Sequence, residues 1–255
     1  MIDQLSGFEK VDIDSIEKDH IFSNRKDFKY LFAIDNLPGI LQKMEKDYLL
    51  MTVGEKLQQK YATHYFDTTD FKFYLDHHNG ILNRMKVRSR FYADGKAFIE
   101  VKKKSNKGIT FKNRLPVIPT EEDIRIDSTI KKGLDLPVDL ELALQLKVAY
   151  KRLTFYSRAF NEKVTIDTSL SYNRDTLEDS KFSLVIAESK GIGHDHSYFN
   201  QLMKENKFKR SSFSKYCYGL SLLEPAVKKN NFKSLHHKAN KIIHAYELSS
   251  TDPEL

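Results

Sequence analysis

Basic side chains recur at alternate positions within three short stretches between Arg84 and Arg114, and this spacing is the clearest chemical signal in the chain. In an extended strand, alternate side chains point to opposite faces, so residues two apart share a face. Read as three neighbouring strands, the segment presents a face with a single carboxylate, Glu100, and at least seven cations. These cations are Lys86, Arg88, Arg90, Lys102, Lys104, Lys112 and Arg114, and Arg84 opens the segment.

A face with charges of one sign predicts a bound anion, because like charges opposite each other on adjacent strands are destabilising. Guanidinium groups make bidentate contacts with phosphate oxygens and lysines add point charge, so bare phosphates suit this face. The alternative is a solvated basic face, for example one that binds nucleic acid. Phe91 and Phe111 fall on the opposite face, so platforms for stacking bases are missing and nucleic acid is the weaker interpretation.

A second cluster lies late in the chain, where the apolar string SLVIAESKG places Glu188 and Lys190 on one face. The two side chains could form a plain ion pair. Alternatively, Glu188 could hold a divalent ion together with phosphates, because Mg²⁺ and Mn²⁺ prefer oxygen ligands. Further basic candidates lie outside both clusters: Arg25, Lys29, Lys163 and Lys215.

Other familiar sites are absent from the sequence. The histidine pairs lack the spacing of a metal site, and no phosphate loop of the G-x-x-x-x-G-K type or G-x-S-x-G motif occurs. Forty-two basic residues against 35 acidic ones give a net charge of +7, which favours anionic partners. A single cysteine, Cys217, excludes an internal disulfide and suits a reducing compartment, so we expect a cytoplasmic protein. No apolar run is long enough to span a bilayer.

The elements that must position these residues are mostly strands. Alternating segments rich in β-branched and aromatic residues predict strands at 27–34, 61–68, 71–75, 81–93, 95–103, 108–117, 149–160, 162–171 and 181–189. Helical periodicity predicts helices at 37–50, 120–133, 137–147, 195–206 and 214–223. Strands in hairpins with inserted helices indicate an α+β protein, with an antiparallel sheet or barrel flanked by helices.

The C-terminal segment has an apolar stripe at helical spacing, running from Phe232 to Tyr246, with lysines around it. This pattern predicts a basic amphipathic helix. The stripe could dock on the body of the protein, or it could contact a membrane surface or a partner helix. We therefore expect one domain over residues 1–224 and a basic amphipathic helix or tail over residues 225–255.

Eight strings in register from Arg25 to Gly219 resemble the vacuolar transporter chaperone (VTC) domain of the triphosphate tunnel metalloenzymes, relatives of the CYTH group. The strings are RKDFKY, YFDTTDFKFYLDH, RMKVRSRFY, FIEVKKK, KNRLP, VTIDTSL, VIAESKG and FSKYCYG. The resemblance implies an antiparallel barrel of about eight strands around a basic tunnel. It also implies an ATP-dependent polyphosphate polymerase that uses Mn²⁺ or Mg²⁺ and extends a pyrophosphate or polyphosphate chain.

The resemblance also distributes roles among the candidate residues. Catalytic contacts fall to Lys29, Arg88, Arg90, Lys102 and Lys190. Phosphate binding falls to Arg25, Arg84, Lys86, Lys104, Lys112, Arg114, Lys163 and Lys215. Metal ligation falls to Glu188 and Glu100. Eukaryotic relatives work in membrane-embedded assemblies, so a separate membrane-protein partner is a further expectation; the oligomeric state is left open.

Two departures from the family pattern bear on the activity. Hydrolases of the wider superfamily begin with a Glu-x-Glu-x-Lys string, which aligns with Arg25, Asp27 and Lys29, so a cation replaces the first carboxylate. This change favours a polymerase over the alternative, a tripolyphosphate or nucleoside triphosphate hydrolase. The family usually has an arginine at Lys163, and lysine keeps the charge but loses the bidentate fork. A catalytically silent polyphosphate sensor is the third interpretation.

Overall fold

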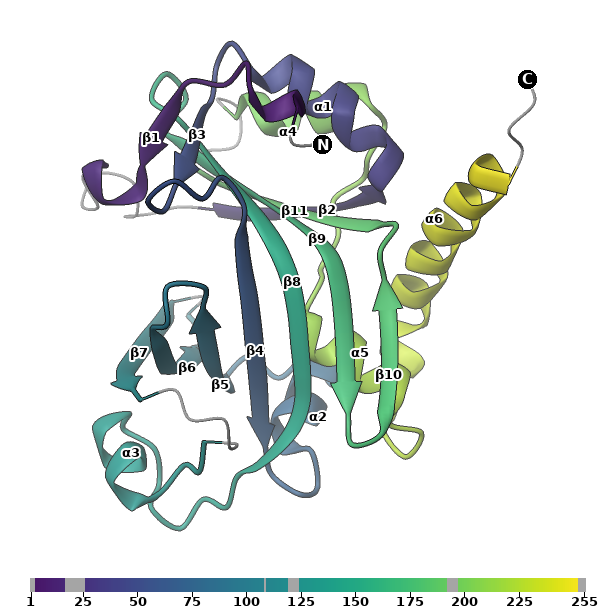
Figure 1. The fold of residues 1–255 in the computed structure, drawn as a ribbon. Coiled ribbons are helices and arrows are strands. Elements are labelled where there is room, and N and C mark those ends of the chain that lie inside the picture. The colour runs from purple at the N-terminus through teal and green to yellow at the C-terminus, as the bar shows by residue number, and fades with distance from the viewer. Residues whose placement is uncertain (1–2, 17–25, 108, 119–123, 192–196, 252–255) are drawn as a thin grey trace.

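The computed structural model describes residues 3–16, 26–107, 109–118, 124–191 and 197–251. Eleven strands in this part of the chain form one sheet, and six α-helices pack around it (Figure 1). The strands are β1 (Lys10–Asp12), β2 (Lys26–Ala33), β3 (Leu49–Thr52), β4 (Gln59–Asp67), β5 (Arg84–Tyr92), β6 (Ala97–Lys104), β7 (Thr110–Val117), β8 (Ala143–Ser157), β9 (Glu162–Arg174), β10 (Leu177–Lys181) and β11 (Leu184–Gly191). The helices are α1 (Leu37–Met44), α2 (Lys72–His78), α3 (Ser128–Gly133), α4 (Tyr198–Glu205), α5 (Lys215–Leu223) and α6 (Lys233–Thr251).

The main path of the sheet runs in the order β2-β11-β9-β8-β4-β5-β6-β7, with every neighbouring pair antiparallel. Beside this path, β10 pairs with β9, and β3 pairs with β8 and with β1. The predicted α+β class and antiparallel sheet are confirmed. A closed barrel was also predicted, but in the described residues β7 pairs only with β6 and β2 only with β11, so hydrogen bonds do not close the sheet.

Alternation along the strands separates two apolar cores from one polar face. Val185 and Ala187 of β11 join a core beneath α1 and α4, whereas Leu184 and Ile186 join a core with α5 and α6 on the opposite side. Glu188 lies on the same face of β11 as Leu184 and Ile186. The polar face is therefore a continuation of the sheet face that α5 and α6 cover. At the other end of the sheet, a third core packs the second face of β5 and β6 against residues 134–136.

The segment 71–75 was predicted as a strand, and this prediction is wrong because residues 72–78 form α2. The buried carboxylate of Asp67 explains the difference. It accepts hydrogen bonds from the backbone N–H groups of Phe73 (2.8 Å) and Tyr74 (2.9 Å), which a first helical turn leaves unpaired. The aromatic side chains of Phe73 and Tyr74 are also buried, so tertiary packing outweighs their strand propensity.

The predicted helix at 137–147 is also wrong, since β8 begins at Ala143 and pairs with both β4 and β9. The helices predicted at 195–206 and 214–223 correspond to α4 and α5, each capped by a serine hydroxyl, Ser197 or Ser214. Within the predicted helix 120–133, α3 begins only at Ser128 behind an Asp127 cap, and residues 119–123 lie outside the described part.

The C-terminal helix α6 docks through its first half. Ala239 is fully buried, and Leu235, Ile242 and Ile243 pack on the core formed with α5. The last turns project from the body (Figure 1), and Leu248 is 59% exposed. No helix in the described residues is long and apolar enough to cross a membrane.

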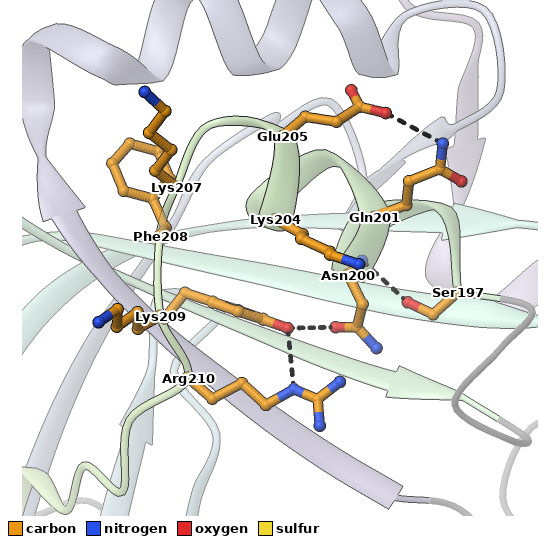
Figure 2. A pocket seen from close by; sticks show the side chains of 10 residues that line it. Ser197, Asn200, Gln201, Lys204, Glu205, Lys207, Phe208, Lys209 and Arg210 are labelled. Carbon is orange, nitrogen blue, oxygen red and sulfur yellow. Dashed lines mark hydrogen bonds between the residues drawn. The ribbon is translucent and has the colours of Figure 1, made fainter.

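A pocket lies at the other end of the fold, beside α4. Its wall is formed by α4, by Tyr30 of β2, and by residues 207–210, which follow α4 (Figure 2). This pocket is on the side of β2 opposite to the polar face.

Candidate functional site

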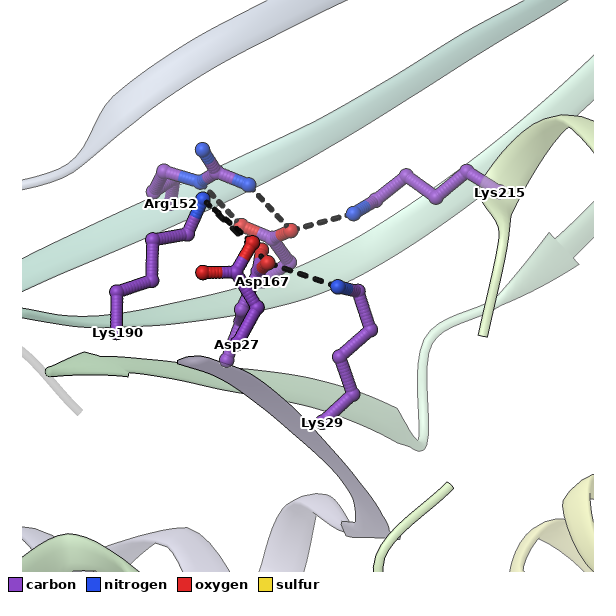
Figure 3. A network of polar contacts seen from close by, with 7 residues as sticks. Asp27, Lys29, Arg152, Asp167, Lys190 and Lys215 are labelled. Atoms are coloured by element: carbon purple, nitrogen blue, oxygen red, sulfur yellow. Dashed lines mark hydrogen bonds and ion pairs between the residues drawn. The ribbon is translucent and has the colours of Figure 1, made fainter. Parts of the chain in front are cut away.

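The polar face of the sheet carries three clusters in which cations surround a carboxylate. The first joins the paired strands β2 and β11, where Glu188 lies opposite Lys29. Lys29 Nζ is 2.7 Å and Lys190 Nζ is 3.4 Å from the same oxygen, Glu188 Oε1. Lys190 Nζ also lies 3.9 Å from Asp27 Oδ2 (Figure 3). The predicted pair Glu188 and Lys190 is therefore brought together with Lys29, although these segments are far apart in sequence.

The second cluster surrounds Asp167 of β9. Arg152 of β8 forms a bidentate pair with it, with distances of 2.6 Å from Nε to Oδ1 and 2.7 Å from Nη2 to Oδ2. Lys215, from the first turn of α5, bonds to Oδ2 from the other side (Figure 3). The Asp167 side chain is 3% exposed, so the cluster is almost fully removed from water.

The third cluster surrounds Glu100 of β6, whose side chain is 2% exposed. Arg88 Nε (2.8 Å) and Nη2 (2.7 Å) contact Oε2, and Lys112 Nζ is 2.7 Å from Oε1. Arg90 Nη1 is 3.9 Å from Oε2. The alternation predicted for β5, β6 and β7 thus brings four of the predicted site residues into one contact group.

Burial alone would raise the pKa of each carboxyl, but the surrounding cations outweigh it. Arg88, Arg90 and Lys112 lower the pKa of Glu100 to about 2. Arg152 and Lys215 lower the pKa of Asp167 to about 2, and Lys190 and Lys29 lower that of Glu188 still further. All three are therefore ionised at neutral pH. Glu100 and Asp167 each neutralise only one of the cations that contact them, whereas Lys190 is shared between Glu188 and Asp27.

The two ends of the sheet face each other across this polar surface. Burial lowers the pKa of Lys102 on β6, and Lys190 and Lys29 on the opposite wall lower it further, against the opposing effect of Asp27 and Glu188. Lys102 also lies opposite Lys86 and Lys112 on the neighbouring strands. Its charge is thus repelled from several directions, which is the condition that a bound anion would relieve.

Stacked tyrosines hold the guanidinium groups in place. Tyr61 and Tyr150 lie face to face with ring centroids 5.2 Å apart. The Arg90 guanidinium lies 5.4 Å from the Tyr61 centroid, and that of Arg152 lies 5.3 Å from both rings. Lys215 Nζ lies 4.4 Å from the Tyr150 centroid. Cation–π contacts of this kind fix the cations without neutralising their charge.

The remaining predicted residues lie around these clusters. Arg114 stacks on Phe98, and Lys163 lies opposite Lys190 in the register of β9 and β11. Lys86 is directed to the N-terminus of α5, where its Nζ lies 3.0 Å from Ser214 Oγ. Burial lowers the pKa of His77, and the nearby charges of Lys86, Arg84 and Lys104 lower it further, so these three cations gather near that ring. Arg25 lies outside the described residues.

Four residues of the site were missed in the sequence: Arg152, Asp167, Tyr61 and Tyr150. One signal was available for Asp167. In the strand KVTIDTSL it lies an even number of residues after Lys163, so the two side chains point to the same face. The other three depend on which strands are neighbours, and that pairing is not written in local periodicity. Arg152 contacts Asp167 because β8 pairs with β9, where the two residues are direct partners.

Divalent metal was predicted at Glu188 and Glu100. The described residues contain no group of three or more His, Cys, Asp or Glu side chains that could hold an ion by themselves. Among the described residues, the ion pairs of Glu188 go to Oε1, and Oε2 could serve as an oxygen ligand for Mg²⁺ or Mn²⁺. Both oxygens of Glu100 are contacted by cations. The donor set thus fits an ion that shares Glu188 with substrate phosphates, and it fits poorly at Glu100.

The antiparallel sheet and its helices form a fold that is similar to a CYTH-like solved structure. The structure of the putative adenylyl cyclase HpAC1 from Hippeastrum is similar, with a TM-score of 0.50 and 14% identity over 78% of this chain and 97% of that one. A structure of the inorganic triphosphatase NE1496 aligns over 78% of this chain and 96% of that one, with 10% identity and a TM-score of 0.36. Curated proteins gave no match.

The family comparison is more specific than the comparison of folds. The VTC domain matches residues 24–135 and 138–224, which together make up most of the chain. The chain therefore belongs to the VTC domain family, as its eight strings predicted. Membership connects the protein with polyphosphate and triphosphate metabolism in general.

Proposed function

We propose that the protein is an ATP-dependent polyphosphate polymerase, which transfers the γ-phosphate of ATP to the end of a growing polyphosphate chain. The observation that carries the proposal is the excess of fixed cations over carboxylates on one concave face. A row of phosphates supplies the missing negative charge along the whole face, whereas a single small anion would neutralise only one cluster. Membership of the VTC domain family supports the same assignment.

Phosphoryl transfer requires alignment and charge neutralisation more than covalent participation by the protein. In the proposed reaction a terminal oxygen of the chain attacks the γ-phosphorus, the bond to the β,γ-bridging oxygen breaks, and ADP leaves. Arg88 and Arg90, fixed by Glu100 and by Tyr61, would hold phosphate oxygens on one wall. Lys29 and Lys190 on the opposite wall would neutralise the charge that develops on the transferred group.

A divalent ion is part of the proposal. Glu188 would hold Mn²⁺ or Mg²⁺ together with oxygens of the substrate phosphates, and the ion would neutralise phosphate charge. Lys29 and Lys190 both contact Oε1 of Glu188, so Oε2 would be the ligand oxygen. The C-terminal helix and a separate membrane protein are proposed means of coupling the activity to a membrane.

The test is a reaction of the purified protein with ATP, Mn²⁺ and a pyrophosphate primer. We expect ADP and a lengthening polymer in equal phosphate equivalents, resolved on a gel and quantified by enzymatic digestion. Release of free phosphate without polymer would contradict the proposal and identify a hydrolase. Binding of triphosphate without any turnover would identify a sensor.

Two variants connect the activity to the site. Glu188→Gln removes the metal ligand and should abolish metal-dependent turnover while leaving most of the triphosphate affinity. Arg88→Ala should weaken triphosphate binding itself. Lys60→Ala is the matched control, because Lys60 is an exposed cation outside the three clusters, and it should change neither quantity.

A further inference from the structure

Strand β9 carries a site residue and core residues on the same side of the sheet, although an odd number of positions separates them. Asp167 is the direct partner of Ile186 on β11, so both side chains point to one side. Ile186 belongs to the core with α5 and α6, and so do Leu170 and Tyr172. In a regular strand, residues three or five apart point to opposite faces. One extra residue must therefore lie between Asp167 and Leu170.

The extra residue is Ser169, which forms a β-bulge. The pairing of β8 with β9 shifts its register between Ala149 and Lys151. Tyr150 therefore lies opposite two residues, Ser169 and Leu170. Ser169 has a φ of 52°, in the left-handed region that residues other than glycine rarely adopt. Such a conformation persists only where the surrounding structure imposes it, and residues of this kind gather at functional sites.

Helix α5 contacts β9 on both sides of this bulge. Its first residue, Lys215, bonds to Asp167 before the bulge (Figure 3). Gly219, four residues later on the same side of the helix, lies against Tyr172 after the bulge. The approach is close, because a Cβ atom on Gly219 would be 2.3 Å from Tyr172 Cδ1. The two contacts are an odd number of residues apart on β9, so one side of α5 makes both of them only because the bulge is present.

The residue opposite the bulge completes the surroundings of Lys215. Lys215 Nζ lies 4.4 Å from the ring centroid of Tyr150 while it bonds to Asp167 Oδ2. Lys215 belongs to a helix, so no strand ladder fixes its position. Its place on the polar face depends on how α5 fits β9, and the bulge determines that fit.

We propose that Ser169 is a positioning residue: its left-handed backbone forms the bulge that holds Lys215 over Asp167 and Tyr150, and thereby sets where Lys215 contacts a phosphate. The inference rests on the proposed function in one respect, since phosphate is taken as the ligand of Lys215. The dependence of Lys215 on the bulge is a property of the protein without ligand, and it can be measured separately.

The experiment ranks substitutions of Ser169 by their tolerance of the left-handed conformation. Glycine adopts it freely and asparagine is enriched in it, whereas valine is β-branched and adopts it rarely. In calorimetric titration of the full chain, Ser169→Gly and Ser169→Asn should bind tripolyphosphate like the wild type. Ser169→Val should bind about tenfold more weakly, the low end of the range for losing a hydrogen bond to a charged group. Ser171→Val is the matched control, because Ser171 lies in the regular ladder beyond the bulge, and it should not change the affinity.

A second background separates positioning from a general loss of stability. If Ser169 acts through Lys215, Ser169→Val should cause no further loss of affinity in a Lys215→Met protein. An equal loss of affinity in both backgrounds would overturn the proposal. Wild-type affinity in a folded Ser169→Val protein would overturn it as well.

Gly219→Ala covers the case in which Ser169→Val fails to fold, because it changes the fit of α5 from the side of the helix. Alanine has a higher helix propensity than glycine, so a harmful effect must come from its contact with the buried ring of Tyr172. The affinity for tripolyphosphate should fall as in Ser169→Val, and again only when Lys215 is present. Unchanged affinity in Gly219→Ala would overturn the proposal.

A wild type that does not bind tripolyphosphate would contradict the proposed function, and the bulge is then tested by unfolding in urea without ligand. Ser169→Val and Lys215→Met should each lower the equilibrium constant for folding. Their combined effect should be smaller than the product of the separate effects, because both variants break the contact of Lys215 with Asp167. Independent effects would overturn the role of Ser169.

Discussion

Replacing Asp167 with asparagine tests whether the carboxylates of the concave face compensate cations in the absence of a ligand. The substitution keeps the shape of the side chain and removes one negative charge from a buried group. Arg152 and Lys215 then remain almost out of water with no compensating charge. Burial alone would raise the pKa of Asp167, but Arg152 and Lys215 lower it to about 2, so these cations stabilise the ionised form more than burial destabilises it.

The magnitude follows from two estimates. Lowering the pKa from 3.8 to about 2 corresponds to about 2 kcal/mol of stability, present above pH 3.8 and lost as the pH falls toward 2. Removing one partner of a buried ion pair usually costs about 3–5 kcal/mol. The cost of breaking the ion pair is the better guide, because asparagine leaves Arg152 and Lys215 buried without their partner. The free energy from the pKa compares only the protonated and ionised forms of Asp167. At about 2–4 °C per kcal/mol, we expect the Tm to fall by roughly 6–20 °C.

The assay is thermal unfolding with and without tripolyphosphate. At 100 times its Kd a ligand stabilises the folded wild type by about 2.7 kcal/mol. The gain at equal concentration should be larger for Asp167→Asn, because the phosphates then compensate two cations that lack a partner. Asp135→Asn is the control, since Asp135 forms an ion pair of 2.7 Å with Lys103 but is 84% exposed. An Asp167→Asn variant as stable as Asp135→Asn, or one that gains less from tripolyphosphate than the wild type, would refute charge compensation.

Three further predictions concern the elements around the site. Burial lowers the pKa of Lys86 to about 8, so an anion bound nearby should raise this pKa. Binding at pH 8 should therefore be coupled to proton uptake, which calorimetry in buffers of different ionisation enthalpy detects. The Lys86→Met variant should take up fewer protons. Asp67→Asn weakens the cap of α2 and the 2.6 Å bond from the Tyr216 hydroxyl, and should cost about 2–4 kcal/mol in chemical denaturation. Deleting residues 226–255 exposes the core beneath α6 and should lower solubility, measured by sedimentation after expression; unchanged solubility would show that α6 acts only as a tether.

Many residues of the polar face could be predicted from the sequence, because alternate side chains of one strand point to the same face. The contacts of Arg88, Glu100 and Lys112 follow directly from alternation in β5, β6 and β7, together with the short connections that make these strands neighbours. Glu188 and Lys190 share a face for the same reason. Periodicity of two residues survives in the folded protein wherever one side of a strand is buried, and here Val87, Ile99 and Val101 fill the other side.

The missing parts depend on contacts between segments that are distant in the sequence. Tyr74 reads as part of a strand, but it lies in a helix because Asp67 accepts its backbone N–H group. Residues 143–147 show helical periodicity, yet they pair with β4, and Lys147 pairs with β9 as well. Pairing with a strand that is distant in the sequence outweighs local propensity, so no window of sequence around Ala143 contains the deciding information.

The pairing of carboxylates with several cations explains how a one-sign face is compatible with folding. Without any carboxylate, the cations on adjacent strands would repel each other and destabilise the pairing of those strands. With one carboxylate for each cation, the ligand would have to displace every ion pair. Glu100 and Asp167 each compensate only part of their cluster, and Lys102 lies between Lys86 and Lys112 on the neighbouring strands. The proposed binding of phosphates would release this remaining repulsion, so the strength of binding and the instability of the empty face would have the same origin.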